Sequence, residues 1–360
     1  MEVYMLRYKE IKQQIDTIIA SMRPAEALPS REALCKSLDT TRSTLDKAIK
    51  ELVAEGKLVT RGGSGTYVAG DVSGQPNEIK SIGVLLPNNT HLSYRMLISG
   101  IEEFMHSKDV NVILCNTDND IDKQNQYLSR LIQSKVIGLI VVPALYFDIT
   151  KNYVLYSRLM QHRFPVVFCF RGIDGLTNAP LVCYNNFYGG YIATKHLITQ
   201  GYRHIAYISE KTLRTSLDRF QGYMAALLEA GLEINRSMVI LEPESRGYEE
   251  MTRILHSGAE VDAVFCQADC LAPHVYRAIR DAGLRVSDDI GVIGFDNSDC
   301  CVTETPAVTS LGNCDAEIGM KAAQILWKAI ENEEEKTFPY FLFSPDIIVR
   351  ESCLGPKKKT

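Results

Sequence analysis

One segment, residues 28–68, restricts the possible folds more than any other part of the chain. It reads LPSREALCKSLDTTRSTLDKAIKELVAEGKLVTRGGSGTYV. Ser30 and Thr41 stand where a hydroxyl can cap a first and a second helix. Leu45 and Leu52 lie on one face of the second helix at helical spacing. Gly56 follows this helix and suits the left-handed residue that commonly ends one. The segment therefore predicts two helices joined by a tight turn.

Two short strands are predicted beyond these helices, at 57–60 and 66–68, and RGGSG joins them. Glycines in such a tip allow the backbone to approach a phosphate chain closely. The second helix opens with TRST, whose hydroxyls and guanidinium suit base edges and phosphates. DNA binding is therefore predicted, and a winged helix used only for protein contacts is the alternative. The predicted DNA-contacting residues are Ser30, Arg31, Thr41, Arg42, Ser43, Thr44, Lys47, Arg61, Gly63, Ser64, Gly65 and Thr66.

These residues resemble the winged helix-turn-helix of the GntR family of bacterial transcription regulators. The matching motifs, in order, are LPS, LDTTRSTLDKAIKEL, EGK and GGSGTYV. Two positions depart from the family pattern. Arg31-Glu32 reverses the usual order of these two residues, and Asp46 stands where the family often has Arg. The resemblance implies a homodimer that places two such modules on a two-fold symmetric operator.

Charge is distributed unevenly along the chain. Its 360 residues carry a formal net charge of -5, so any DNA binding must be local. Residues 1–70 hold eleven Lys and Arg against nine acids, a net of +2, which leaves -7 for the remainder as the difference between -5 and +2. This asymmetry has the sign that a DNA-binding N-terminus requires.

The ten cysteines are scattered and lack the spacing of a zinc site, so we expect reduced thiols rather than metal ligands. No apolar signal segment or membrane-spanning run is visible, which predicts a cytoplasmic protein without a membrane partner.

The hydrophobic pattern of the sequence changes at residue 79. Apolar strand candidates alternate with helical patterns: IGVLLP, VNVILCNT, IGLIVVP, VVFCF, LVCYN, HIAYIS, SMVIL, AVFCQ and IGVIGFD. Continuous apolar runs of this kind predict parallel strands covered on both faces. We therefore expect an α/β chain with a DNA-binding domain at 1–69, a linker at 70–78 and a two-lobed parallel α/β domain at 79–360. Ligands of such sheets bind at the carboxyl ends of the strands.

The second part resembles the sugar-sensing domain of lac repressor-type regulators and the related periplasmic sugar-binding proteins. Its motifs are YNNFYGGYIATKHLITQGYRHIAYI, DRFQGYMAALLEAGL, VDAVFCQADCLAPHVYRAIRDAGLRVSDDIGVIGFDNSD, TPAVTSL and IIVRES. With the GntR-type module, the arrangement is similar to that of arabinose repressors. The resemblance implies a transcriptional regulator, most simply a repressor, controlled by a small sugar or sugar derivative bound between the lobes.

Candidate effector-binding residues follow from strand ends and from this resemblance. Asp296 ends IGVIGFD and can accept from two hydroxyls, whereas Arg219 in DRFQGY can donate as a fork. Alternatively, Arg219 pairs with an acid across the cleft, Tyr94 is ordinary loop packing, and Asp269 only caps a helix. Phe170 replaces a common Asp and Ala268 a common Asn, so the ligand cannot be copied from a relative. The predicted effector-binding residues are Ser93, Tyr94, Arg171, Thr215, Arg219, Asp269, Asp296 and Asn313.

Catalytic and cofactor motifs are not recognisable in the sequence. Gly189-Gly190 is no GxGxxG fingerprint and suits close helix packing instead. We expect no enzyme activity, cofactor or metal. The rival hypotheses are an exported solute-binding protein, and a GntR-type fusion to a pyridoxal-phosphate aminotransferase fold.

Overall fold

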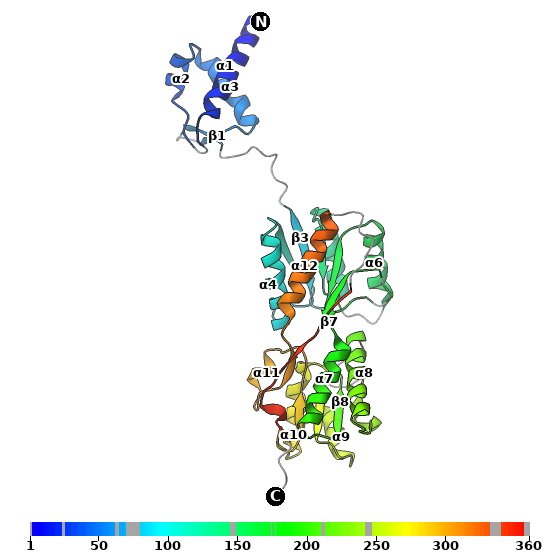
Figure 1. Cartoon of the computed structure of the whole chain (residues 1–360). Helices are drawn as coiled ribbons and strands as arrows, with labels where there is room; N and C mark the ends of the chain where they lie inside the picture. The colour runs from blue at the N-terminus through cyan, green and yellow to red at the C-terminus, as the bar shows by residue number, and fades with distance from the viewer. Residues whose placement is uncertain are drawn as a thin grey trace. The chain divides into compact units, whose positions relative to one another are not determined.

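The chain divides into two compact units, Met1–Ile79 and Lys80–Thr360 (Figure 1). The structure is a computed structural model, and each unit is described by itself. It describes residues 2–23, 26–61, 65–69, 80–144, 149–173, 175–176, 178–209, 213–241, 247–331 and 340–355. The predicted linker at 70–78 lies outside these residues, as do Gly63 and Ser64.

The N-terminal unit is a winged helix-turn-helix, as predicted. Its elements are α1 (Glu2–Ala20), α2 (Arg31–Ser37), α3 (Arg42–Ala54), β1 (Leu58–Arg61) and β2 (Gly65–Val68). The hydroxyl of Ser30 accepts from the Ala33 N–H at 3.2 Å and so caps α2. Thr41 precedes α3 but makes no cap bond to the backbone, because its hydroxyl is hydrogen-bonded to those of Ser43 and Thr44.

A small apolar core holds these elements together. Ile11 and Ile15 of α1 pack against Leu45, Ile49 and Leu52 of α3, and all five are buried. Burying each such side chain contributes about 1.5–3 kcal/mol. The strands β1 and β2 pair antiparallel. This core covers the apolar face of α3, and the opposite face of the helix is exposed to solvent.

The first lobe of the C-terminal unit is built on a six-stranded sheet. The strand order is β13-β7-β6-β5-β3-β4, and every neighbouring pair is parallel. The strands are β3 (Ser81–Leu86), β4 (Asn111–Asn116), β5 (Leu139–Val141), β6 (Val166–Cys169), β7 (Leu181–Tyr184) and β13 (Tyr340–Phe343). The helices are α4 (Leu92–His106), α5 (Ile121–Gln133), α6 (Ile149–Gln161) and α12 (Asp315–Glu331).

The second lobe is built on a four-stranded parallel sheet in the order β11-β10-β8-β9. Its strands are β8 (Ile205–Ile208), β9 (Val239–Ile240), β10 (Ala263–Cys266) and β11 (Gly291–Ile293). Its helices are α7 (Asn186–Thr199), α8 (Arg214–Glu229), α9 (Tyr248–His256), α10 (Ala272–Asp281) and α11 (Cys300–Thr303). The sequence did not predict three strands: β13 of the first lobe, β12 (Ser310–Gly312) and β14 (Asp346–Ile348). β12 and β14 pair antiparallel.

The chain passes between the lobes after β7, after β12 and after β13, and these crossing segments are hydrogen-bonded to one another. The Tyr184 hydroxyl donates to Asp315 Oδ1 at 2.6 Å and accepts from the Cys314 N–H at 3.0 Å. The Asn185 N–H donates to the Phe343 carbonyl at 2.8 Å. The carboxyl ends of β7 and β13 are thus tied to the start of α12.

Glycines bring two helix pairs into backbone contact. A Cβ at Gly190 of α7 would lie 2.0 Å from the Arg219 carbonyl oxygen, and one at Gly222 of α8 would lie 2.0 Å from that of Phe187. Gly100 of α4 and Gly319 of α12 are related in the same way. The close-packing interpretation of Gly189-Gly190 is confirmed, because Gly189 abuts the Phe295 ring. This packing places Arg219 against the start of α7.

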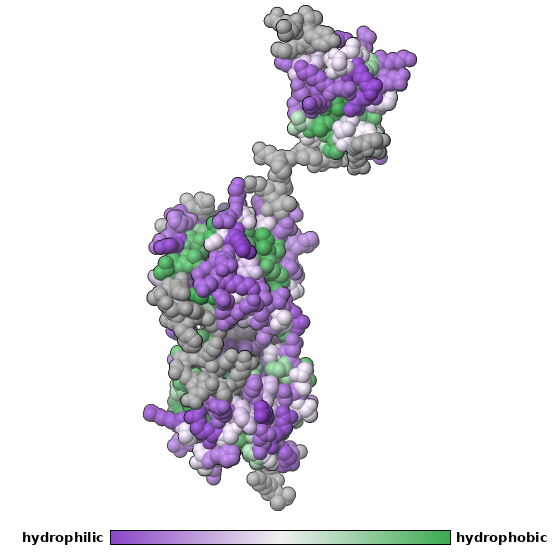
Figure 2. Space-filling model, turned by 180° about the vertical axis from the view of Figure 1, so that it is seen from behind, coloured by the Kyte–Doolittle hydropathy of each residue, from purple (hydrophilic) through white to green (hydrophobic). Residues whose placement is uncertain are grey.

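One expectation about the sheets was wrong. The apolar run at β4 was predicted to be covered on both faces, yet Ile113 and Leu114 are 36% and 45% exposed. The reason is that β4 is the outer strand of the six-stranded sheet, with only β3 beside it. Figure 2 shows hydrophilic residues on both lobes of the C-terminal unit, together with hydrophobic patches on the first lobe.

Candidate functional site

The predicted DNA-contacting face centres on the start of α3. Arg42, Ser43 and Lys47 are exposed, and the Lys47 ammonium lies 4.2 Å from the centre of the Tyr8 ring of α1. Thr44 and Thr66 are buried. Ser30, Thr41 and Gly65 are exposed, and Arg61 ends β1.

The two positions that depart from the GntR pattern lie together. Arg31 Nε donates to Asp46 Oδ1 at 3.0 Å, which joins the start of α2 to the second turn of α3. Since Asp46 occupies a position where the family often has Arg, its carboxylate lowers the positive charge of this face. Arg31 is thereby oriented by Asp46 instead of extending freely into solvent.

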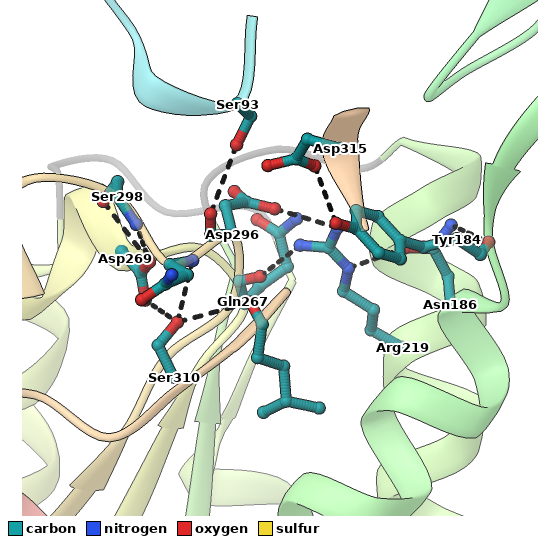
Figure 3. Close-up of polar contacts among 12 residues, drawn as sticks. Ser93, Tyr184, Asn186, Arg219, Gln267, Asp269, Asp296, Ser298, Ser310 and Asp315 are labelled. Carbon is teal, nitrogen blue, oxygen red and sulfur yellow. Dashed lines mark hydrogen bonds and ion pairs between the residues drawn. The ribbon is translucent and has the colours of Figure 1, made fainter. Parts of the chain in front are cut away.

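Arg219 is the central residue of the polar network in the C-terminal unit (Figure 3). It is buried near the start of α8, and its three nitrogens have different partners. Nε donates to Asn186 Oδ1 at 2.8 Å, Nη1 to the Gln267 carbonyl at 2.6 Å, and Nη2 to Asp296 Oδ1 at 3.2 Å. Its guanidinium also lies 3.5 Å from the centre of the Phe295 ring. Arg219 therefore joins the starts of α7 and α8 to the ends of β10 and β11.

Asp296 projects from this network toward the first lobe. Its side chain is 31% exposed, and its backbone carbonyl accepts from the Ser93 hydroxyl of α4 at 3.2 Å (Figure 3). Its φ of 98° lies in the left-handed region, as do the φ values of Phe170 and Asn313, which also follow strands. Such backbone costs about 1–3 kcal/mol per residue and clusters at functional sites.

Two buried carboxyls lie behind and beside Asp296. Asp269 accepts from the Ser298 N–H at 2.8 Å and from the Ser310 hydroxyl at 2.7 Å, so it holds the loop after β11. Burial and the nearby Asp296 charge raise the pKa of Asp269 to about 7. Burial also raises the pKa of Asp315, which accepts from Tyr184, to about 6. The site thus contains one partly exposed carboxylate, that of Asp296, and two buried carboxyl groups, those of Asp269 and Asp315.

A cavity of about 540 Å³ opens beside this network, between β6 and the start of α8. Among the eight predicted effector residues, Arg171 and Thr215 line it. Asn186 also lines the cavity, so it stands between this space and Arg219. Asp296 and Ser93 are not part of its wall. Phe170 lines it, and its ring stacks with that of Tyr184 at 6.2 Å between ring centres.

Comparisons with known proteins agree with this architecture. Residues 7–68 match the model of the bacterial regulatory proteins of the gntR family, and residues 194–353 match that of the periplasmic binding protein-like domain. The chain is 32% identical over 284 residues to the HTH-type transcriptional repressor PurR of Pasteurella multocida (strain Pm70), covering 77% of this chain and 82% of that repressor.

The chain belongs to the family of PurR- and LacI-type transcriptional repressors. Solved structures of such regulators have the same fold. A LacI family regulator from Enterococcus faecium with bound ribose is 27% identical, with a TM-score of 0.63, and covers 78% of this chain and 100% of its own. The regulator CelR in complex with cellobiose is 25% identical, with a TM-score of 0.66, and covers 86% and 90%. This repressor is therefore a DNA-binding regulator with an effector domain.

The remaining predicted effector residues lie around the network of the repressor. Tyr94 is half-buried, and its ring centre lies 5.9 Å from that of Phe170. Asn313 is exposed at the crossing between β12 and α12. Arg171 Nε donates to the Pro143 carbonyl at 2.8 Å, and its buried Nη2 has no hydrogen-bond partner among the residues described.

The sequence interpretation missed several residues that organise the repressor's site. Asn186 and Asp315 were not proposed, although Asn186 stands in the quoted motif YNNFYGG. Gln124 and Asn152 were also missed. Gln124 Oε1 accepts from the Ala144 N–H at 2.8 Å, and Asn152 Nδ2 donates to the Ala144 carbonyl at 3.1 Å. These two amides fix a wall of the cavity, and no sequence motif marks them.

The described part of the repressor offers no group of three or more His, Cys, Asp and Glu side chains that could hold a metal ion. Within the same part, no helix combines the length and the apolar character that spanning a bilayer requires.

Proposed function

We propose that a small sugar or sugar derivative binds between the lobes of this cytoplasmic repressor, beside Asp296 and Arg219, and changes its affinity for operator DNA. The observation that carries the proposal is the Asp296 carboxylate. Its Oδ1 is bound to Arg219, while Oδ2 has no partner among the described residues and the side chain is partly exposed. Such a carboxylate can accept from a ligand hydroxyl with a charge-assisted bond.

The surroundings of Asp296 also suit a sugar. Aromatic rings of Tyr94, Phe170 and Tyr184 form a linked series, with neighbouring ring centres 5.9 and 6.2 Å apart. An apolar wall with a few oriented polar groups is the usual composition of a small-molecule site. The buried Nη2 of Arg171 is a further donor. The ribose and cellobiose bound by two related regulators support this class of ligand.

A ligand can change DNA affinity only by binding one arrangement of the lobes better than another. The lobes of this unit meet at Ser93 and Asp296, and again where Arg95 Nη2 lies 3.2 Å from Asp299 Oδ2. A ligand that engages Asp296 therefore acts on a loop that already contacts both lobes. This contact suits an effector that binds one relative arrangement of the two lobes better than another.

We further propose that the repressor is a homodimer that uses the exposed apolar side chains of α4 and β4. Met96, Ile113 and Leu114 are 42%, 36% and 45% exposed. An exposed apolar edge strand invites association unless a partner covers it. Light scattering should give a dimer for the native protein and a monomer for Leu114→Glu. Leu354→Glu, at a position 57% exposed on the second lobe, where the Leu354 N–H donates to Ser287, is the control and should remain dimeric.

A thermal-shift panel of monosaccharides, disaccharides and sugar phosphates tests the proposed effector, followed by calorimetry with the best compound. Asp296→Asn should lower affinity for that compound by about 2–4 kcal/mol, since a charge-assisted pair is lost. Operator binding without ligand should survive in a gel shift. Asp281→Asn, on α10 of the same lobe and 55% exposed, should bind the compound normally. Unchanged affinity in Asp296→Asn would remove this carboxylate from the site.

A further inference from the structure

The loop that carries Asp296 also carries two cysteines, and these lie against a third. Cys300 and Cys301 begin α11, and the Cys300 thiol donates to the Asp269 carbonyl at 3.3 Å. Cys270 is the residue directly after Asp269, and its side chain is exposed. Cys300 is half-buried, whereas Cys301 and Cys266 are buried. Two accessible thiols therefore flank the same peptide group.

The distance between these two thiols is bounded by the covalent geometry. The Asp269 carbonyl oxygen and the Cys270 Cα belong to one planar trans peptide group and lie about 3 Å apart. Since Cys300 Sγ is 3.3 Å from that oxygen, it lies within about 6 Å of the Cys270 Cα. This bound places the Cys300 sulfur near Cys270, whereas the Cα atoms of a disulfide lie up to about 6.8 Å apart and its Cβ atoms about 3.5–4.5 Å apart. A bridge therefore needs the Cys300 side chain and the short turn Asp269–Leu271 to rotate toward each other, and neither segment is part of β10 or β11.

The surroundings of Cys300 favour its reaction with an oxidant. The Ser298 hydroxyl lies 3.1 Å from its sulfur. The hydrogen bond from the Cys301 thiol, followed by that of Ser298, lowers the pKa of Cys300 to about 7. Thiolate and exposure are the two properties that select a cysteine for oxidation. The buried thiols of Cys266 and Cys301 have raised pKa values, because burial and neighbouring groups disfavour their ionised forms.

We infer that Cys270 and Cys300 are a reversible oxidation site that reacts with hydrogen peroxide, and that the oxidation loosens the loop holding Asp296. The Cys300 thiolate attacks one peroxide oxygen, the O–O bond breaks, and the departing hydroxide takes a proton to become water. The Cys270 thiolate then attacks the sulfur of the resulting sulfenic acid. The S–S bond forms, the S–O bond breaks, and the second hydroxide takes up the proton that Cys270 released when its thiolate formed. The two thiols lose two electrons in total, and the peroxide is reduced to two waters.

The bridge would change the loop because Cys300 now holds it in place. Cys300 contacts Ser298, whose N–H and hydroxyl both donate to Asp269 Oδ2. Turning the Cys300 sulfur toward Cys270 breaks its contact with the Asp269 carbonyl. Because Asp296 and Asp299 lie on either side of Ser298 in this short loop, both would lose part of their support.

Hydrogen peroxide titration of the full-length protein tests the inference. After mild oxidation, intact mass should show the loss of two hydrogen atoms, and peptide mapping should find Cys270 joined to Cys300. Hydrogen exchange of the Ser298 amide should then rise about tenfold, the change that a loss of about 1.4 kcal/mol of local protection produces. Dithiothreitol should reverse both effects. No step in this experiment needs the effector, so its outcome is independent of the proposed function.

Cys270→Ser should prevent both the mass change and the increase in hydrogen exchange. Because Cys270 is exposed, this substitution should leave the fold intact, and a thermal melt of the variant checks this. Cys270→Ala is the second variant if serine alters the turn. Cys35→Ser, at a half-buried thiol of α2 in the other unit, is the matched control and should oxidise like the native protein. A bridge between other cysteines, or no bridge before overoxidation, would overturn the inference. So would a Cys270–Cys300 bridge that leaves exchange unchanged.

Discussion

Replacing Arg219 with methionine tests whether this one side chain stabilises the second lobe. Arg219→Met keeps a long apolar stem but removes the donors that Asn186, the Gln267 carbonyl and Asp296 receive. Removing one partner of a buried pair costs about 3–5 kcal/mol. The Arg219 side chain is 7% exposed, but Asp296 is 31% exposed and can be rehydrated. We therefore expect the lower end, about 3 kcal/mol.

The loss should be visible in calorimetry of the full chain. For a unit of this size each kcal/mol corresponds to about 2–4 °C, so the Tm of the C-terminal unit should fall by about 6–12 °C. Operator binding should persist at low temperature, since the N-terminal unit has its own core. Arg214→Met is the matched control: it lies on the same helix, is 76% exposed and pairs with Asp218. Such a surface pair contributes about 0.3–0.5 kcal/mol. Equal shifts in the two variants would refute the assigned role of Arg219.

Three further predictions concern charge. Arg42→Ala should weaken operator binding by about 1–3 kcal/mol if Arg42 contacts a base. Asp46→Asn should strengthen binding to operator and unrelated duplexes alike, because it releases Arg31 and removes a negative charge from the same face. A gel shift at two salt concentrations measures both effects. Folding raises the pKa values of Asp269 and Asp315 above the ordinary value of 3.8, so the protonated carboxyls stabilise the folded state fully at a pH below 3.8. This stabilisation is lost as the pH rises through about 6 to 7. The urea midpoint of the C-terminal unit should therefore fall less between pH 5 and pH 8 in Asp269→Asn than in the native protein, and an identical fall would argue against a raised pKa at Asp269.

Local features of the N-terminal unit could be predicted from the sequence because they depend on neighbouring residues. The Ser30 cap and the buried face of α3 need only short-range spacing. The pair between Arg31 and Asp46 could not be predicted in the same way. Each position was recognisable as a departure from the family, but their contact depends on how α2 and α3 cross.

The sheets and the polar network around Arg219 also contain features that the sequence could predict and features that it could not. Nine apolar runs marked nine strands, whereas β12, β13 and β14 have only three or four residues each and were not predicted. Arg219 and Asp296 stood at recognisable motif positions. Asn186 and Asp315 acquire their roles from the crossing segments, where parts of the chain distant in sequence meet. Such contacts follow from the topology of the lobes and not from any local pattern.

The topology also indicates how a ligand at Asp296 can act beyond its own lobe. The Asp296 carbonyl accepts from Ser93, and Asp299 pairs with Arg95, so the loop after β11 contacts the first two turns of α4 twice. α4 in turn meets α12 through backbone contact at Gly100 and Gly319, which leaves no soft side chains to absorb a small displacement. A shift of the loop would therefore move α4 and α12 together. Because α4 also carries Met96 of the proposed dimer surface, the proposed effector loop and the proposed subunit interface would share one rigid element.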